Sequence, residues 1–298
     1  MKVAKLLHNP EAGDEDHKEK ELISMIESSG FKCVYSSTKK KGWKEIEPEV
    51  DFLIVAGGDG TVRKIVKELL DRKVLEKTWP IALLPLGTAN NIARTLGISC
   101  TTEEIIQSWH AGKVKRYDVG RIHDITGADF FLEAFGYGVF PYLIQEMKKQ
   151  GKESIEIAEE KMQAALQLLH QIILSYKPRY CRLEVDGTGH SGKLLLAEIM
   201  NTRSIGPNLV LSPHGDPGDG ELEVVFVPEK QKERFASYVF DRMRGLDETY
   251  VFSTLKAKNI QISWDGTHVH VDDKIVKVNK SKEVRIELKE GLVEFLVP

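Results

Sequence analysis

Apolar and polar positions follow two different periods in the first hundred residues. Asp51–Ala56 is an almost unbroken apolar run, and Ile81–Leu84 repeats it, which is typical of strands buried on both faces of a parallel sheet. Between them, Thr61–Leu70 gathers its apolar residues on one side of a helix. Strands that alternate with helices predict an open α/β sheet. The other elements predicted here are strands over Lys2–Leu7 and Phe31–Tyr35 and helices over Asp16–Ser29, Ala89–Leu96 and Thr102–His110.

The pattern changes after about residue 118 to short alternating strands separated by turn signals such as Asp186-Gly187 and Asp265-Gly266. This texture is typical of an antiparallel sandwich. One amphipathic helix, Ile155–Tyr176, interrupts it, and its mixed rather than basic polar face favours core packing over a membrane surface. The strands predicted here are Arg179–Val185, Gly192–Met200, Glu221–Val227, Asn259–Trp264, His268–Val271, Glu283–Leu288 and Leu292–Val297.

Composition narrows the class of protein. With 41% hydrophobic and 29% charged residues, the 298-residue chain has the mass for two ordinary globular domains. A net charge of −3 disfavours nucleic-acid binding, which normally needs a basic excess. The first ten residues lack the apolar run of a secretion signal, and no stretch reaches the ~18 apolar residues of a membrane span. Three scattered cysteines without CxxC spacing fit reduced thiols, so we expect a soluble cytoplasmic protein.

Candidate chemistry begins at Gly57-Gly58-Asp59-Gly60-Thr61, which lies directly between a buried strand and a helix. Ligands of open α/β sheets bind beyond the carboxyl ends of the strands, where a helix N-terminus offers backbone N–H groups to an anion. The glycines allow close approach of phosphate oxygens, and Thr61 can donate to them. Asp59 would repel phosphates unless a cation such as Mg²⁺ stood between them. The alternative is a plain tight turn in which Asp59 only caps a helix.

A second loop of the same kind follows the next predicted strand, at Pro85-Leu86-Gly87-Thr88-Ala89-Asn90-Asn91-Ile92-Ala93-Arg94. It should therefore meet the same edge of the sheet. Thr88 and Asn90 can bond a phosphate or a base, and Arg94, one helical turn further on, can reach an anionic group. By itself the loop could also be a glycine turn with a threonine cap and a surface arginine.

Together these motifs resemble the diacylglycerol kinase catalytic domain family, which includes sphingosine kinases and small bacterial lipid kinases and is related to NAD kinases through the GGDGT motif. Gly57–Thr61 is identical to that motif, and Pro85–Arg94 is nearly identical to the family's PLGTANDFAR. Asn9-Pro10 resembles its NPxSG, Asp118-Val-Gly its DVG, and Asp219-Gly-Glu-Leu-Glu-Val its DDGLLDV. The resemblance covers most of the chain.

The resemblance implies an α/β nucleotide-binding domain over residues 1–118, a β-sandwich substrate domain over 119–288, and a chain end, about 289–298, that returns to the first domain. It also implies an active site in the cleft between the domains. Asp118 and Asp219 would join an Asp–water–Mg²⁺ network, with Asp219 on a structural metal, and Arg94 would hold the lipid or its phosphate. Asp219 before Gly220 also suits a plain tight turn. The residues assigned to ATP binding are Asn9, Gly57, Gly58, Gly60, Thr61, Thr88 and Asn90.

Four departures from the family pattern change charge near the expected site. The family's DGE, whose glutamate is a candidate general base, falls on Asp272-Asp273-Lys274, and a protonated lysine cannot be a base. Asn91 and Lys64 stand where acidic residues are usual. Acidic residues follow Asn9-Pro10, at Glu11, Asp14, Glu15 and Asp16, where basic residues are frequent. These changes indicate an acceptor without a phosphate, another base (Asp59, Asp272 or Asp273), or weak catalysis.

The sequence therefore predicts an ATP- and Mg²⁺-dependent kinase that phosphorylates a lipid hydroxyl, taken from a membrane surface by a peripherally bound protein. The acceptor stays open among diacylglycerol, phosphatidylglycerol, a sphingoid base and monoacylglycerol, and a homodimer stays open as the assembly. One alternative is an NAD kinase-like phosphotransferase. The other is a catalytically silent nucleotide- or lipid-binding homologue, and Lys64, Asn91 and Lys274 favour this second alternative. His268 and His270 alternate with Asp272 along one strand, but the spacing of further ligands does not support a metal site there.

Overall fold

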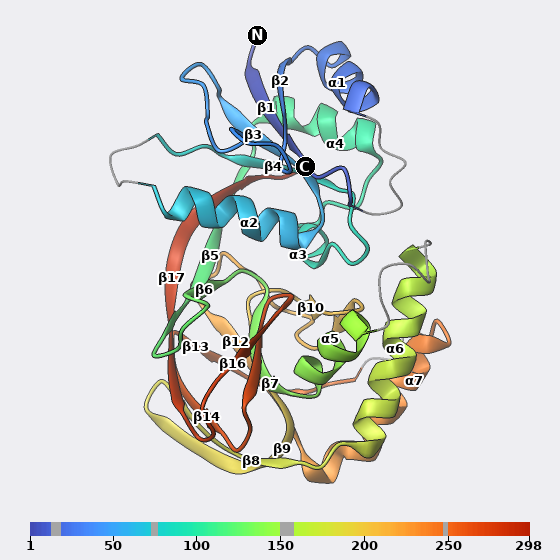
Figure 1. Cartoon of the computed structure of the whole chain (residues 1–298), viewed down its shortest axis with the longest axis vertical. Helices are drawn as coiled ribbons and strands as arrows, with labels where there is room; N and C mark the ends of the chain where they lie inside the picture. Colours follow the sequence, from blue (N-terminus) through green and yellow to red (C-terminus); the bar gives the residue numbers. More distant parts are fainter. Residues whose placement is uncertain (13–18, 73–76, 150–157, 247–249) are drawn as a thin grey trace. The chain divides into compact units, whose positions relative to one another are not determined.

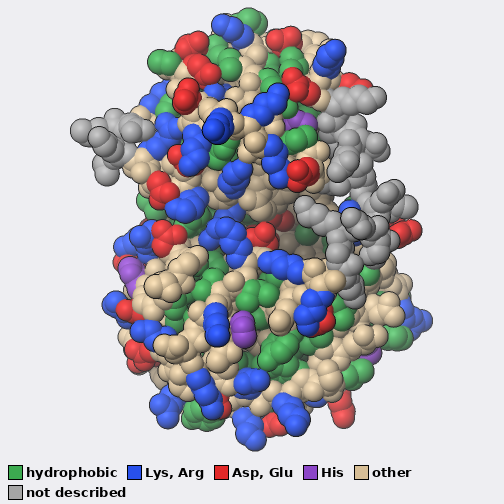
Figure 2. Space-filling model, viewed as in Figure 1, with side chains coloured by type: hydrophobic (Ala, Val, Ile, Leu, Met, Phe, Trp, Pro, Cys, Tyr) green, Lys and Arg blue, Asp and Glu red, His purple; other side chains and the backbone are tan. Residues whose placement is uncertain are grey.

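A computed structural model describes residues 1–12, 19–72, 77–149, 158–246 and 250–298. The chain divides into two compact units, the first formed by Met1–Tyr117 with Gly291–Pro298 and the second by Asp118–Glu290. Two strands, β5 (Val114–His123) and β17 (Glu283–Leu296), carry the chain between the units (Figure 1). On the face seen in Figure 2, acidic and basic side chains are interspersed on both units.

The first unit is built on a parallel sheet, as the apolar runs predict. Its strand order is β2 (Lys32–Ser37), β1 (Val3–His8), β3 (Phe52–Gly57) and β4 (Ile81–Pro85), with the end of β17 added beside β4. Every residue of β3 is buried. Because all four strands run in one direction, their carboxyl ends, and the loops that follow them, share one edge.

Helices of the first unit follow the strands in the chain order that the sequence predicts. The longest is α2 (Asp59–Leu70), whose apolar side packs against β3. An aromatic cluster of Phe31, Phe52 and Trp109 closes the other end of the core, with ring centroids 5.5–6.0 Å apart. The remaining helical segments are α1 (Glu19–Ser28), α3 (Asn91–Thr95), α4 (Thr102–Ser108) and the 3₁₀ turn Trp109–Ala111.

The second unit is a β-sandwich-like domain of antiparallel strands. Its central strand is β9 (Thr188–Met200), which pairs with β7 (Ala134–Gly138), β8 (Arg179–Val185) and β12 (Leu222–Pro228). The hairpin between β8 and β9 turns at Asp186-Gly187, where both residues have positive φ. The other strands are β6 (Phe130–Phe131), β10 (Ser204–Ile205), β11 (Leu209–Val210), β13 (Ser253–Ala257), β14 (Asn259–Trp264), β15 (His268–Val271) and β16 (Lys274–Lys277).

Three helices accompany this domain: α5 (Val139–Lys149), α6 (Ala158–Ser175) and α7 (Lys232–Met243). Helix α6 contacts both of the others and buries Leu166, Leu169 and Ile173, so its apolar face is used in packing, as its mixed polar face indicates. The aromatic run before α5 is also core, since Phe131 and Phe135 are fully buried. Among the helices of the described ranges, none combines the length and the apolar character that crossing a bilayer needs.

The two predicted strands at the chain end are one continuous strand. Residues Glu283–Leu288 and 292–296 both belong to β17, in which Gly291 takes a positive φ of 59° and the strand continues through it. The described elements without a counterpart among the predicted ones are helices α5 and α7 and strands β5, β6, β7, β10, β11, β13 and β16. Residues 16–18 of the predicted first helix and 155–157 of the predicted long helix lie outside the described residues.

Candidate active site

The first candidate loop forms the turn between β3 and α2, as its sequence predicts. Gly58 is the N-cap of α2 in an extended conformation, and no side chain caps the helix from that position. The backbone N–H groups of Thr61 and Val62 donate to the Gly58 carbonyl at 2.8 and 3.2 Å. The first turn of α2 therefore retains N–H groups and the positive end of a twelve-residue helix for an anion.

The two glycine loops press against each other. A Cβ atom placed on Gly87 would lie 2.4 Å from the Cα atom of Gly58, and one on Gly58 would lie 3.1 Å from the Cα atom of Gly87. The Leu86 N–H donates to the Gly57 carbonyl at 3.2 Å. The contact between the loops thus leaves no room for a Cβ atom at 87 and little room at 58, a reason that their sequence alone does not give.

Asp59 joins the two loops through its carboxylate. Oδ2 accepts a hydrogen bond from the Asn91 N–H at 2.9 Å, and Oδ1 accepts one from the Ile92 N–H at 3.0 Å. These donors are the first N–H groups of α3, so Asp59 caps the helix that follows the second loop rather than its own.

The side chains of Asn90 and Asn9 form hydrogen bonds at this edge of the sheet. Asn90 has a left-handed backbone (φ 53°), and its Nδ2 donates to the carbonyls of Pro85 and Gly87 at 3.0 and 2.6 Å. Its Oδ1 accepts from the Gly87 N–H at 3.0 Å, so the side chain closes the second loop on itself. Asn9, at the end of β1, donates from Nδ2 to the Thr61 hydroxyl at 3.2 Å.

The structure thus brings the residues expected in the ATP site of the first unit to one edge. They lie at the carboxyl ends of β1, β3 and β4 or at the start of α2. Thr88 is half-buried in the second loop, and Arg94 is exposed on α3. The set is Asn9, Gly57, Gly58, Asp59, Gly60, Thr61, Thr88 and Asn90.

Two of the departures from the family pattern have structural partners. The Lys64 Nζ atom donates to the Thr38 carbonyl at 2.7 Å and lies 4.8 Å from the centre of the Trp43 ring. Partial burial, with the charges of nearby lysines, lowers the pKa of Lys64. Glu11 forms an ion pair with Lys39, with Nζ and Oε2 2.6 Å apart. Asp14, Glu15 and Asp16 lie outside the described residues.

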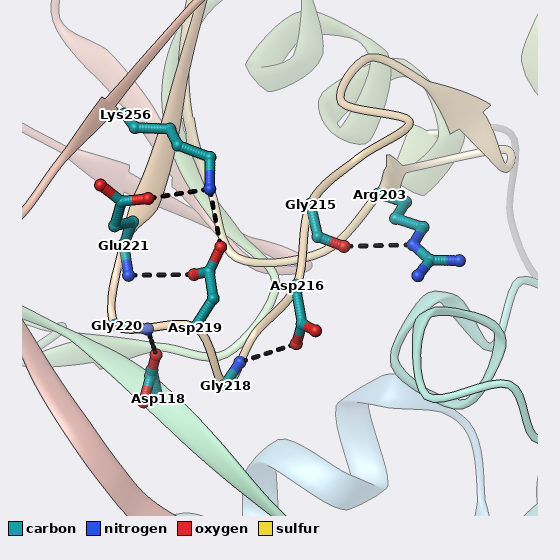
Figure 3. Close-up of polar contacts among 9 residues, drawn as sticks. All are labelled: Asp118, Arg203, Gly215, Asp216, Gly218, Asp219, Gly220, Glu221 and Lys256. Carbon is teal, nitrogen blue, oxygen red and sulfur yellow. Dashed lines mark hydrogen bonds and ion pairs between the residues drawn. The ribbon is translucent and has the colours of Figure 1, made fainter.

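Asp118 and Asp219 lie together in the second unit (Figure 3). Asp118 is 2% exposed, and its Oδ2 accepts from the Gly220 N–H at 2.9 Å. Asp219 accepts from the Glu221 N–H at 3.0 Å through Oδ1, and its Oδ2 lies 2.7 Å from the Nζ of Lys256. Lys256 also reaches Oε2 of Glu221 at 2.8 Å.

A structural metal on Asp219 does not fit this set of contacts. The carboxylate already has a cationic partner in Lys256, and Asp118 is bound to backbone. Within the described part of the chain, no group of three or more His, Cys, Asp or Glu side chains is arranged to hold a metal ion. Gly218 stands where the motif DDGLLDV has its first aspartate, which removes a further carboxylate.

The two candidate bases of the second unit differ sharply in their surroundings. Asp272 is 7% exposed and has a φ of 52°. Its Oδ1 accepts from the N–H groups of Leu132, Glu133 and Ala134 at 3.1, 2.8 and 3.2 Å, so it anchors the segment that leads into β7. Asp273 is exposed beside it. The Asp272 carboxylate therefore has a structural role, whereas the Asp273 carboxylate is accessible.

A fully buried pair of side chains lies next to Asp272 and is not among the sequence-predicted site residues. The Nε2 atom of His270 lies 2.6 Å from Oε2 of Glu198, and both side chains are 0% exposed. Burial raises the pKa of Glu198. At His270 burial lowers the pKa, but the charge and hydrogen bond of Glu198, together with Asp272, outweigh burial, so the pKa of His270 is raised. The sequence signal for this pair is the single glutamate within the apolar run Leu194–Met200, because a buried carboxylate needs a polar partner.

Glu223 is a second buried carboxylate that the sequence did not single out. It is 2% exposed, and neither of its oxygens has a hydrogen-bond partner among the described residues. Burial, with the charge of Asp219 adding to it, raises the pKa of Glu223 to about 7. It lies on β12 directly opposite Lys256 on β13, so these two side chains share one face of the sheet.

Comparisons with known proteins agree with this arrangement. Residues 3–122 match the diacylglycerol kinase catalytic domain, and residues 147–263 match the YegS C-terminal NAD kinase beta sandwich-like domain. A diacylglycerol kinase of Bacillus subtilis is 25% identical over 277 residues, 88% of this chain and 86% of its own. The crystal structure of a diacylglycerol kinase from Bacillus anthracis has a TM-score of 0.71 at 22% identity, covering 100% of this chain and 97% of that one.

The fold also extends to a more distant group of enzymes. An NAD kinase from Archaeoglobus fulgidus, solved in complex with ATP, has a TM-score of 0.50 at 13% identity, covering 99% of this chain and 93% of that chain. At this identity the likeness concerns the fold alone.

Proposed function

Because the chain belongs to the family of bacterial diacylglycerol kinases and YegS-like lipid kinases, we propose that it transfers the γ-phosphate of ATP to a hydroxyl group of a lipid. The observation that carries the proposal is the Asp59 bridge. One carboxylate ties the turn that begins α2 to the turn that begins α3, and so fixes two sets of backbone N–H groups at one edge of the parallel sheet. Such an edge suits a polyphosphate.

Several groups of the chain would then bind different parts of the nucleotide. The uncapped first turn of α2 receives phosphate oxygens, and the Thr61 hydroxyl, oriented by Asn9, donates to the same group. The Asp59 carboxylate would hold Mg²⁺, which would neutralise phosphate charge. Thr88 and Arg94 lie on the second loop and α3, where they are available to the nucleotide and to an anionic part of the acceptor.

We assign the role of general base to Asp273 rather than Asp272. A base must have a free lone pair that reaches the acceptor hydroxyl. The Asp272 carboxylate is buried and engaged by backbone N–H groups, whereas Asp273 is exposed on the neighbouring position. Lys274, at the position of the family's glutamate, is exposed and takes no part in this assignment.

The acceptor is proposed from the relatives. The Bacillus subtilis relative bears the name diacylglycerol kinase, so diacylglycerol is the first acceptor to test. Phosphatidylglycerol, a sphingoid base and monoacylglycerol carry the same kind of hydroxyl and form the rest of the panel.

Radiolabelled ATP with the lipid panel in mixed micelles tests the proposal, with NAD⁺ as a water-soluble acceptor alongside. Label in one extracted lipid supports a lipid kinase and identifies its acceptor. Label in NAD⁺ instead supports the nicotinamide-nucleotide kinase alternative. If ATP binds and no acceptor is labelled, the chain is a nucleotide-binding homologue without turnover, and the proposal is wrong.

A further inference from the structure

Carboxylates crowd the turn that leads into β12. Asp219 begins the turn, Glu221 immediately precedes β12, and Glu223 is the second residue of that strand. Their mutual influence is visible at Glu223, where the charges of Asp219 and Glu221 add to the effect of burial in raising its pKa to about 7. Such a concentration of negative charge needs a counter-ion.

The chain provides that counter-ion itself. Lys256 lies on β13, directly opposite Glu223 in the antiparallel pair, and its Nζ lies 2.7 Å from Asp219 and 2.8 Å from Glu221. One ammonium thus stands at the point on which oxygens of two carboxylates converge (Figure 3). These two bonds raise the pKa of Lys256, so it is charged at neutral pH.

The other oxygen donors of the turn are already engaged by backbone. Asp118 accepts from the Gly220 N–H at 2.9 Å, and Asp216 accepts from the Gly218 N–H at 3.0 Å. Gly218 itself supplies no carboxylate. A hard divalent cation would need the converging oxygens of Asp219 and Glu221, and these already hold the Lys256 ammonium.

We infer that the Lys256 ammonium occupies the place of the divalent cation that the resemblance assigns to Asp219, and that the second unit of this protein therefore needs no structural metal. The inference concerns only the Asp219 turn and does not depend on the proposed kinase activity. It makes a further prediction: without the lysine, two carboxylate oxygens converge on one empty point, which is where a divalent cation would bind.

The test begins with the wild-type full-length chain, freed of metal with EDTA and studied without nucleotide. We expect the Tm to be the same with EDTA, with millimolar Mg²⁺ and with millimolar Ca²⁺, and we expect no metal to copurify with the chain. A stoichiometric Mg²⁺ or Ca²⁺ that raises the Tm, and that is lost in Asp219→Asn, would overturn the inference. This measurement needs no variant that might fail to fold.

Lys256→Met gives the complementary result. We expect its Tm in EDTA to fall by several degrees, and we expect Ca²⁺ or Mg²⁺, but not NaCl of the same ionic strength, to restore at least half of the loss. Lys258→Met is the matched control, because it removes the same charge two residues away, where the lysine contacts Glu290. It should show no specific response to divalent cations. Lys256→Arg, which keeps a cation, should remain independent of metal; an Arg variant that requires Ca²⁺ would contradict the inference.

Discussion

Gly87→Ala tests the contact between the two glycine loops. The added Cβ would lie 2.4 Å from the Cα atom of Gly58 and 2.8 Å from Oδ1 of Asn90, where ordinary contact begins near 3.4 Å. The loops must therefore separate by about 1 Å. Neither side of the contact is the flexible end of a long side chain, because one is backbone and the other is an amide held by three hydrogen bonds.

The cost can be worked from these contacts. Forcing one extra carbon into a packed site costs about 1–3 kcal/mol, and disturbing the Asn90 bonds adds about 1 kcal/mol. We therefore expect the free energy of unfolding to fall by about 2–4 kcal/mol. A displacement of about 1 Å in the groups that hold the phosphates reduces a transfer rate by about 100-fold.

Urea unfolding and calorimetric titration with ATP measure the two effects. Gly189→Ala is the matched control, because a Cβ at that position meets nothing within 4 Å. It should change stability by less than about 0.5 kcal/mol and leave ATP binding unaltered. If Gly87→Ala equals wild type in both stability and ATP affinity, the loops do not form the binding edge described above.

Three further predictions concern side chains outside the glycine loops. Glu223 keeps its proton to about pH 7 in the folded chain but loses it near pH 4.5 in the unfolded chain, so the free energy of unfolding falls as pH rises between these values. Glu223→Gln should remove this fall, about 3 kcal/mol, in urea unfolding at pH 5 and 8. Glu184→Gln, at an exposed site, should retain it. Lys64→Met should cost about 1 kcal/mol in the same assay, through its lost bond to backbone, without changing the transfer rate; an altered rate would give Lys64 a part in the reaction. Asp272→Asn should lower the Tm because three backbone N–H donors lose their acceptor. Asp273→Asn should lower the transfer rate and leave the Tm unchanged. The reverse result would make Asp272 the base.

The alternation of buried strands and helices was sufficient to predict the first unit. Residues 52–56 and Ile81–Leu84 are buried, a pattern typical of a parallel sheet covered by helices. The glycine motifs could be placed at the strand ends for the same reason. The family and the mixed α/β and sandwich-like fold, predicted from these motifs in order, are confirmed by the comparisons.

The side-chain partners could not be predicted because they depend on contacts between distant segments. Asp59 caps a helix that begins 32 residues later, a distance in sequence at which a capping pattern is not visible. Lys256 meets Asp219 only because β13 pairs with β12, and β13 itself lacks a strong apolar pattern. Glu198 and His270 are 72 residues apart, and pairing them requires knowing that both strands face the same core.

The central claim is phosphotransfer at the edge organised by Asp59, and the most direct measurement is label transferred from [γ-³²P]ATP to diacylglycerol in mixed micelles. Wild type should label the lipid. Asp59→Asn, which weakens the bridge to α3 and removes the charge available to Mg²⁺, should reduce the rate by at least about 100-fold. Asp71→Asn, at the opposite end of α2, should retain the wild-type rate. Equal labelling by wild type and Asp59→Asn would contradict the account.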